Sequence, residues 1–387
     1  MRFISVAAMG LALVLLPALA HGAADCVAPS KNQTIKLPGR PFAAVASADE
    51  CWIFVSLLQG HPGSVAVLRN RRGSFVLVHT VKLKRPAAGE ALSSDGRVLA
   101  VAGGSGVMVL DTAKLERNAS DPQLGFFRTG SEPIYIALGA NNGVLFVSEE
   151  KAQLIGVFGL AKARRDAFKG SHFIGNIPTG GGPVGLAFSP NGKWLFATVQ
   201  VALDEMDLPK TCKPEFKRER KHAQGVLMQI NAKLAATHPR DAVVATVPAG
   251  CNPVRVAVSP SGKSLWVTAR GSGQLLQFNA QNIHSKPKRY SVGTSPVGVA
   301  VVRPDGKQVW VADSARFGPG KSRLVGLRKA PDGAFGKPVS VAVSGFPREL
   351  NFLPDGRDLV TTLTNARKIK IIVAPVQTGQ IGQNAAQ

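Results

Sequence analysis

The chain has 387 residues, of which 45% are hydrophobic and 18% are charged, so it can bury a large core and is not a disordered protein. Glycine and proline together supply 67 residues, about 17% against a usual ~12%, without a Gly-X-Y period. This composition excludes collagen and argues against a helical bundle. The formal net charge of +23 predicts attraction to anionic partners without specifying one.

The first twenty residues have the pattern of a cleavable export signal. Arg2 precedes an apolar run, and Ala18-Leu19-Ala20 matches the small residues before a signal peptidase cut. The run is shorter than the roughly 20 residues of a membrane-spanning helix, and Pro17 interrupts it, which disfavours a transmembrane anchor. We therefore expect a signal peptide over 1–20, with a cut that could fall as late as residue 24, and a periplasmic or secreted protein. Disulfides persist in such compartments.

One phrase recurs seven times between residues 39 and 362: a Gly, a Pro, alternating apolar residues, a short turn and a second β run. It is clearest at 180–199, 250–269 and 293–312. Successive prolines lie 43 to 51 residues apart, except for one gap of 70. The prolines are Pro41, Pro86, Pro133, Pro183, Pro253, Pro296 and Pro347. A period of this length is typical of repeat architectures such as propellers.

Each repeat is predicted to form four short strands, A to D, bounded by Gly, Pro, Asn and Asp. In the fifth repeat these strands are 254–258, 264–268, 274–278 and 288–292. Four-stranded units around a ring make an all-β, seven-bladed β-propeller of antiparallel blades. The seventh repeat ends with its third strand at 368–373, so we expect the N-terminal strand 33–37 to complete that blade and close the ring. The propeller then spans 25–374, and 375–387 is a flexible tail.

The repeats resemble the seven-bladed YVTN-type propellers, which are close in fold to lactonase-like propellers. The matching residues are 183–193, with counterparts at 253–263 and 296–307. The second strand departs from the family pattern, because LFAT, LWVT, VWVA and LFVS stand where YVTN is typical. These motifs are structural, so the resemblance implies the fold and carries no catalytic residue with it.

The 70-residue gap predicts an insertion over about 201–225, between the second and third strands of the fourth blade. In a propeller the D–A and B–C connections share one face, here called the top, and the A–B and C–D connections share the bottom. A long charged insertion on the top is either a functional loop or a tolerated surface loop. Cys212 and Cys251 both fall on the top, and Cys26 and Cys51 both fall at the bottom. We therefore predict the disulfides Cys26–Cys51 and Cys212–Cys251.

The top face also carries the polar candidates for a binding site. Carboxylates and arginines around one channel could bind a polar or anionic small molecule, or they could be ordinary rim charge. The candidate ligand-binding residues are His61, Glu132, Asn252, Asp313, Arg316 and Asn365. A lactone hydrolase would need a base and an oxyanion stabiliser, for which Glu149 or Glu150 and Arg270 or Arg348 are the candidates.

Other site classes have little support. The seven histidines show no HxH or HExxH spacing, so we expect no metal and no cofactor. Basic clusters could attract nucleic acid or an anionic envelope polymer, but Phe216 and Tyr290 are the only aromatic residues beside them. We predict an exported, non-catalytic binding scaffold that uses its top face for a protein, an envelope polymer or a small polar ligand. Lactone hydrolysis is the alternative, and binding of nucleic acid or an anionic polymer is the second alternative.

Overall fold

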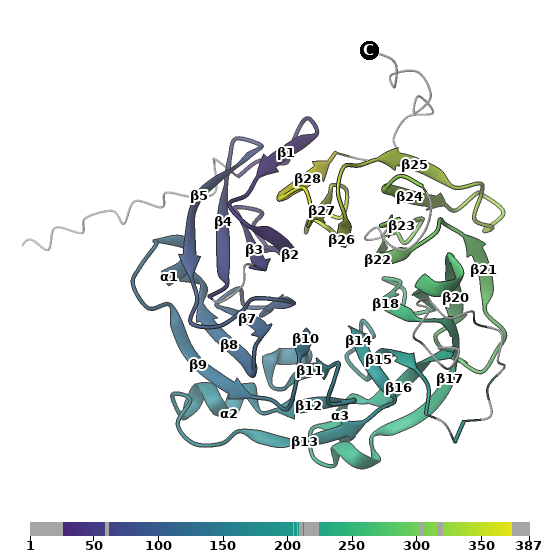
Figure 1. The fold of residues 1–387 in the computed structure, drawn as a ribbon, viewed down its shortest axis with the longest axis horizontal. Coiled ribbons are helices and arrows are strands. Elements are labelled where there is room, and N and C mark those ends of the chain that lie inside the picture. Colours follow the sequence, from purple (N-terminus) through teal and green to yellow (C-terminus); the bar gives the residue numbers. More distant parts are fainter. Residues whose placement is uncertain are drawn as a thin grey trace, which may run out of the picture.

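The computed structural model describes residues 26–58, 62–203, 205, 206, 208, 212, 224–301, 305–315 and 320–373. Seven four-stranded antiparallel sheets stand around a central axis, as the repeats predict (Figure 1). The predicted signal peptide, the tail 375–387 and most of the insertion 201–225 lie outside the described residues. None of the described helices has the length and apolar character that a membrane crossing requires.

Within blades 1 to 6 the strands follow chain order from the axis outward, and in blade 7 the first strand of the chain takes the outermost place. Blade 1 consists of β2 (Arg40–Ala46), β3 (Trp52–Leu58), β4 (Ser64–Arg71) and β5 (Ser74–Lys82), and blade 2 consists of β6 (Glu90–Leu92), β7 (Val98–Gly103), β8 (Gly106–Asp111) and β9 (Gln123–Arg128). Blade 3 consists of β10 (Pro133–Leu138), β11 (Leu145–Glu149), β12 (Leu154–Phe158) and β13 (Phe173–Pro178). Blade 4 consists of β14 (Gly181–Phe188), β15 (Trp194–Val201), β16 (Gln224–Asn231) and β17 (Val243–Cys251).

Blades 5 to 7 consist of β18 (Pro253–Val258), β19 (Ser264–Ala269), β20 (Gln274–Asn279) and β21 (Lys288–Ser291); β22 (Pro296–Val301), β23 (Gln308–Asp313), β24 (Arg323–Arg328) and β25 (Val339–Ala342); and β26 (Pro347–Phe352), β27 (Leu359–Leu363), β28 (Lys368–Ile372) and β1 (Gln33–Lys36). β1 pairs antiparallel with β28, so the N-terminal strand completes blade 7 and closes the ring as predicted.

Short helices lie in several connections, an addition to the repeat that the sequence analysis does not anticipate. They are α1 (Thr112–Glu116), α2 (Leu160–Arg165), α3 (Ala232–Ala235), η1 (Ala140–Asn142), η2 (Pro239–Asp241) and η3 (Arg270–Ser272). The side chains of Asp111 and Asn231 accept hydrogen bonds from main-chain N–H groups in the first turns of α1 and α3. α1, α2, α3 and η2 all lie in C–D connections and therefore on the bottom face.

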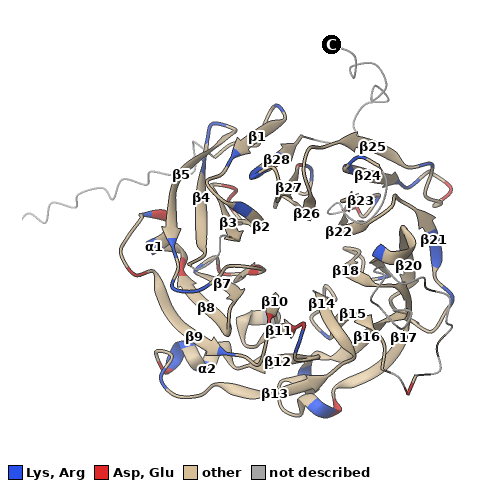
Figure 2. Cartoon of the chain, in the orientation of Figure 1, with Lys and Arg blue, Asp and Glu red and all other residues tan. Residues whose placement is uncertain are grey.

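The apolar cores lie between neighbouring blades. The core between blades 4 and 5, for example, packs Phe196 and Leu227 against Leu265, Val267 and Leu276. Because alternate residues of a strand face opposite sides of its sheet, each blade contributes to two such cores. Charged residues lie mostly outside these cores, and Lys and Arg are distributed along the perimeter of the ring (Figure 2).

A side-chain hydroxyl on the second strand of five blades ties each blade to the next. Each hydroxyl donates to the carbonyl of a residue near the start of the next blade's inner strand. The pairs are Ser56 with Ala88 (2.5 Å), Ser148 with Val184 (3.0 Å), Thr198 with Val254 (2.9 Å), Thr268 with Val297 (2.8 Å) and Thr362 with Phe42 (3.2 Å). Blades 2 and 6 have Ala102 and Ala312 in its place.

In blade 2 a direct main-chain bond replaces the hydroxyl. The N–H of Gly89 donates to the carbonyl of Ile134 in blade 3 at 3.1 Å. A Cβ at Gly89 would lie 2.3 Å from that carbonyl oxygen, so only glycine permits this approach.

Both predicted disulfides are present. Cys26–Cys51 joins the segment before β1 to the start of β3. Cys212–Cys251 joins the blade-4 insertion to the end of β17. Each bridge fastens a segment that the sheet ladder does not hold, one at the ring closure and the other on the top face.

Candidate functional site: the channel and the top face

Seven equivalent positions, one on the inner strand of each blade, face the centre of the ring. Four of them carry small residues, and the remaining three carry long polar side chains. The residues are Ala43, Gly89, Tyr135, Gly185, Arg255, Gly298 and Glu349. The small residues leave room for the three long side chains to meet across the channel.

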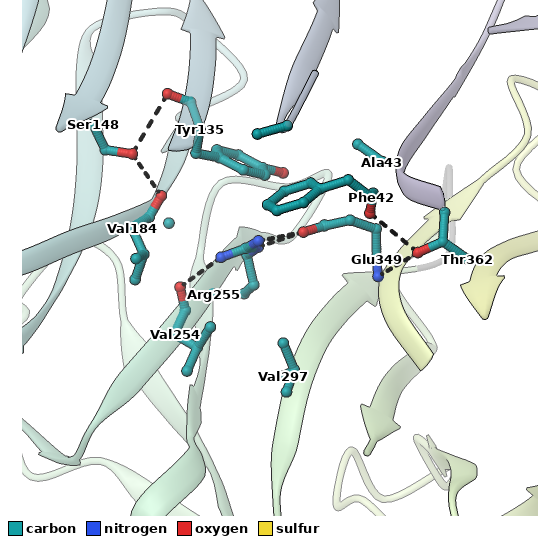
Figure 3. A network of polar contacts seen from close by, with 12 residues as sticks. Phe42, Ala43, Tyr135, Ser148, Val184, Val254, Arg255, Val297, Glu349 and Thr362 are labelled. Atoms are coloured by element: carbon teal, nitrogen blue, oxygen red, sulfur yellow. Dashed lines mark hydrogen bonds and ion pairs between the residues drawn. The ribbon is translucent and has the colours of Figure 1, made fainter. Parts of the chain in front are cut away.

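Tyr135, Arg255 and Glu349 meet in the channel from blades 3, 5 and 7 (Figure 3). The Arg255 Nε donates to Glu349 Oε1 at 2.9 Å, and its Nη2 donates to the same oxygen. The guanidinium carbon also lies 4.5 Å from the centre of the Tyr135 ring. Arg255 and Glu349 are each only 4% exposed. The three side chains therefore form a network that joins blades remote in sequence.

The charges of this network follow from its geometry. Burial lowers the pKa of Arg255, but Glu349 and Tyr135 outweigh burial, and the net pKa is raised. Burial and the Glu349 carboxylate together raise the pKa of Tyr135, and Arg255 offsets only part of that effect. The centre therefore holds a neutral phenol beside an ion pair. Removing one partner of such a buried pair costs about 3–5 kcal/mol, because the other charge is left uncompensated.

A second carboxyl, Glu90, lies close to this network but outside its hydrogen bonds. It is 5% exposed, and neither carboxyl oxygen has a hydrogen-bond partner among the described residues. Burial raises its pKa well above the ordinary value, a weak contact with the main chain of Ser56 that falls short of a well-formed hydrogen bond offsets part of this, and the charge of Glu349 raises the pKa further. The other six blades have aliphatic residues at this register position. These are Ala44, Ile136, Leu186, Val256, Val299 and Leu350.

The predicted base candidates on the top face are engaged in local contacts. Glu149 is the last residue of β11 and is buried, and its Oε2 accepts from the main-chain N–H groups of Gly130 (2.5 Å) and Ser131 (3.2 Å). Burial raises the pKa of Glu149, and these two amides lower it in part. Glu150 accepts a hydrogen bond from Gln200 Nε2 at 2.8 Å.

Asp313 repeats the arrangement of Glu149 at the end of β23. Its Oδ1 accepts from the N–H groups of Thr294 (3.1 Å) and Ser295 (2.9 Å), and its Oδ2 accepts from Arg323 Nε at 3.2 Å. In blades 3 and 6, therefore, a carboxylate at the end of the second strand holds the turn that enters the inner strand.

The remaining predicted residues are dispersed. Arg348 lies within β26 rather than in a D–A turn, with its guanidinium 3.7 Å from the centre of the Phe42 ring. Arg270 opens η3, and its N–H donates to the carbonyl of the buried Asn252 at 3.2 Å. Glu132 is exposed and forms an ion pair with Lys151. Asn365 is exposed in the turn before β28, and His61 and Arg316 lie outside the described residues.

Sequence reasoning missed the channel network. Tyr135, Arg255 and Glu349 each stand two positions after the recurring proline of their repeat. Aligning the seven repeats on that proline would have shown three long polar residues among small ones. No cluster of three or more possible metal-ligating side chains (His, Cys, Asp or Glu) occurs among the described residues.

Comparisons with known proteins identify the fold. No family model and no curated protein matches the chain. A chain of Kuenenia stuttgartiensis hydrazine synthase matches with a TM-score of 0.65 and 18% identity, over 87% of this chain and 96% of that one. A chain of a mitotic checkpoint complex matches with a TM-score of 0.64 and 16% identity, over 96% of this chain and 98% of that one. A periplasmic gluconolactonase of Pseudomonas aeruginosa matches with a TM-score of 0.60 and 21% identity, over 83% of this chain and 88% of that one. At these identities the similarity shows a shared propeller fold and nothing finer.

Proposed function

We propose that the protein is an exported, periplasmic propeller of the YVTN type that acts as a non-catalytic binding scaffold through its top face. Export is supported by the leader-like first twenty residues and by the two disulfides. The YVTN assignment is supported by the repeated Gly-Pro phrase and the four-stranded blades.

One observation carries the non-catalytic assignment: the buried ion pair of the channel and the carboxylates at the top-face turns are each held by partners within the protein. Arg255 and Glu349 form a buried ion pair over which the Tyr135 ring packs. The carboxylates of Glu149 and Asp313 accept from turn amides. A hydrolase needs a base free to activate water and a donor placed for the developing oxyanion. These side chains instead hold the inner strands and their turns, as a rigid scaffold requires.

Lactone hydrolysis is the activity to test against this proposal. The purified, disulfide-intact protein is incubated with a panel of aliphatic and sugar lactones, and ring opening is followed by proton release. The expected rate equals that of the buffer. Turnover that is abolished in both Glu149→Gln and Arg270→Gln, but retained in the exposed bottom-face control Asp121→Asn, would refute the scaffold assignment.

A further inference from the structure

The bottom face has a strongly asymmetric charge. Its A–B and C–D connections in blades 3 to 5, together with Lys288 at the start of β21, carry ten cations and two carboxylates. The cations are Lys162, Arg164, Arg165, Lys169, Lys193, Lys233, Arg240, Lys263, Lys286 and Lys288, and the carboxylates are Asp166 and Asp241. We call this set of ten cations the basic arc. The same connections of blades 7, 1 and 2 carry seven acidic and five basic residues, so the bottom is not uniformly basic.

The cations of the basic arc lie on neighbouring connections. α2 and the residues after it project Lys162, Arg165 and Lys169 from blade 3. β13 of blade 3 contacts η2 of blade 4, which carries Arg240. Blue segments at α2, beside α3 and at β21 mark the arc along one side of the ring (Figure 2). Three consecutive blades therefore present positive charge on the same face, along one side of the ring.

Little of this charge is neutralised within the protein. Arg164 pairs with Asp95 of blade 2 at 3.0 Å. Asp166 lies 3.8 Å from His172 Nδ1. Lys162, Lys169, Lys193, Lys233 and Lys263 are all exposed to solvent. Placing like charges side by side is unfavourable for the isolated protein, so a concentration of this kind suits an anionic partner.

We propose that the basic arc binds an acidic polysaccharide of the cell envelope, a partner distinct from that of the top face. Lysine supplies seven of the ten cations, and it acts as a point charge that accepts anions of varied geometry. Repeated carboxylates on a flexible sugar chain can meet cations spread in this way. Nucleic acid fits less well, because single-strand binding uses several stacking aromatic side chains. Among the described residues near the arc, Phe173 is the one largely exposed aromatic side chain, at 50%.

The test compares two variants of equal net charge. The arc variant carries Lys→Gln at positions 162, 169, 193, 233 and 263. The control variant carries Lys→Gln at positions 31, 36, 82, 84 and 321, which are also exposed but lie elsewhere. Binding of the full-length protein to fluorescent oligoalginate, an oligomer of uronic acids, is measured by anisotropy at 50, 100 and 200 mM NaCl. Circular dichroism melts verify that both variants fold.

The arc variant is expected to bind oligoalginate at least about tenfold more weakly at 50 mM NaCl, with a shallower dependence of log K on log salt. The control variant is expected to stay within about threefold of the unmodified protein. Equal weakening by both variants would show diffuse attraction and overturn the proposal, as would no binding to oligoalginate at 50 mM NaCl. Tighter binding to single-stranded DNA of equal charge at 200 mM NaCl would assign the arc to nucleic acid instead.

Discussion

Replacing Glu90 with an aliphatic residue should stabilise the protein. Glu90 occupies a register position that is aliphatic in the other six blades, and it is 5% exposed without a hydrogen-bond partner among the described residues. A buried polar group without a partner costs about 1–3 kcal/mol. Ionisation does not remove this cost, because burial disfavours the charged form and raises the pKa. We therefore expect Glu90→Val and Glu90→Leu to raise the free energy of unfolding by about 1–3 kcal/mol at pH 7.

The same residue predicts a dependence of stability on pH. The pKa of Glu90 is raised in the folded protein above its unfolded value of about 4.3. The folded state therefore binds this proton more tightly than the unfolded state does. The stabilisation that protonation gives to the folded state is fully present below the unfolded pKa. The effect is lost as the pH rises from about 4.3 through the raised folded value. The stability advantage of Glu90→Leu over the unmodified protein should accordingly be larger at pH 7 than at pH 4.5.

Urea unfolding followed by tryptophan fluorescence at both pH values measures this difference. Glu132→Gln serves as the control. Because Glu132 is exposed, its replacement should not alter the difference in unfolding free energy between pH 7 and pH 4.5. If Glu90→Leu and Glu90→Val are both less stable than the unmodified protein at pH 7, the carboxyl has a stabilising partner and the reasoning is wrong.

Three further predictions concern contacts at the blade boundaries and on the two faces. Thr268→Val removes the hydroxyl between the Arg255 N–H and the Val297 carbonyl and should cost about 1–3 kcal/mol of unfolding free energy in urea, whereas the exposed Thr237→Val should cost little. Removing either disulfide should lower the unfolding free energy by about 3–4 kcal/mol, because the bridges close loops of 25 and 39 residues in the unfolded chain. Calorimetry of the double variants Cys26→Ser/Cys51→Ser and Cys212→Ser/Cys251→Ser measures this loss, and unchanged melting temperatures would contradict the prediction. Glu149→Ala leaves the amides of Gly130 and Ser131 without their acceptor and should lower the unfolding free energy by about 1–3 kcal/mol, with faster hydrogen exchange confined to that turn; unaltered exchange there would contradict the assigned contact.

The architecture could be predicted from the sequence because it depends on local patterns that repeat. The recurring proline, the alternating apolar residues and the turn residues predicted four strands per blade. The seventh repeat lacks a fourth strand of its own, and this predicted closure by β1. The cysteine pairs followed from which connections share a face. These inferences needed only strand order and the alternation of loops between two faces.

The channel could not be predicted in the same way, because its contacts join distant blades. Arg255 and Glu349 are 94 residues apart, and neither stands in a loop, where polar candidates were sought. Glu149 and Asp313 were correctly placed near the top, but the sequence does not reveal that turn amides surround their carboxylates. A side chain's partner depends on tertiary approach, which repeat spacing does not specify.

A double-mutant cycle on Arg255 and Glu349 tests most directly whether these two charges are buried as one coupled pair that joins blades 5 and 7 across the channel. Arg255→Met and Glu349→Leu should each lower the unfolding free energy by about 3–5 kcal/mol, because each leaves the other charge buried and unpaired. The double variant should lie close to the unmodified protein, giving a coupling energy of several kcal/mol. Additive losses, or single variants as stable as the unmodified protein, would contradict a structural role for this pair.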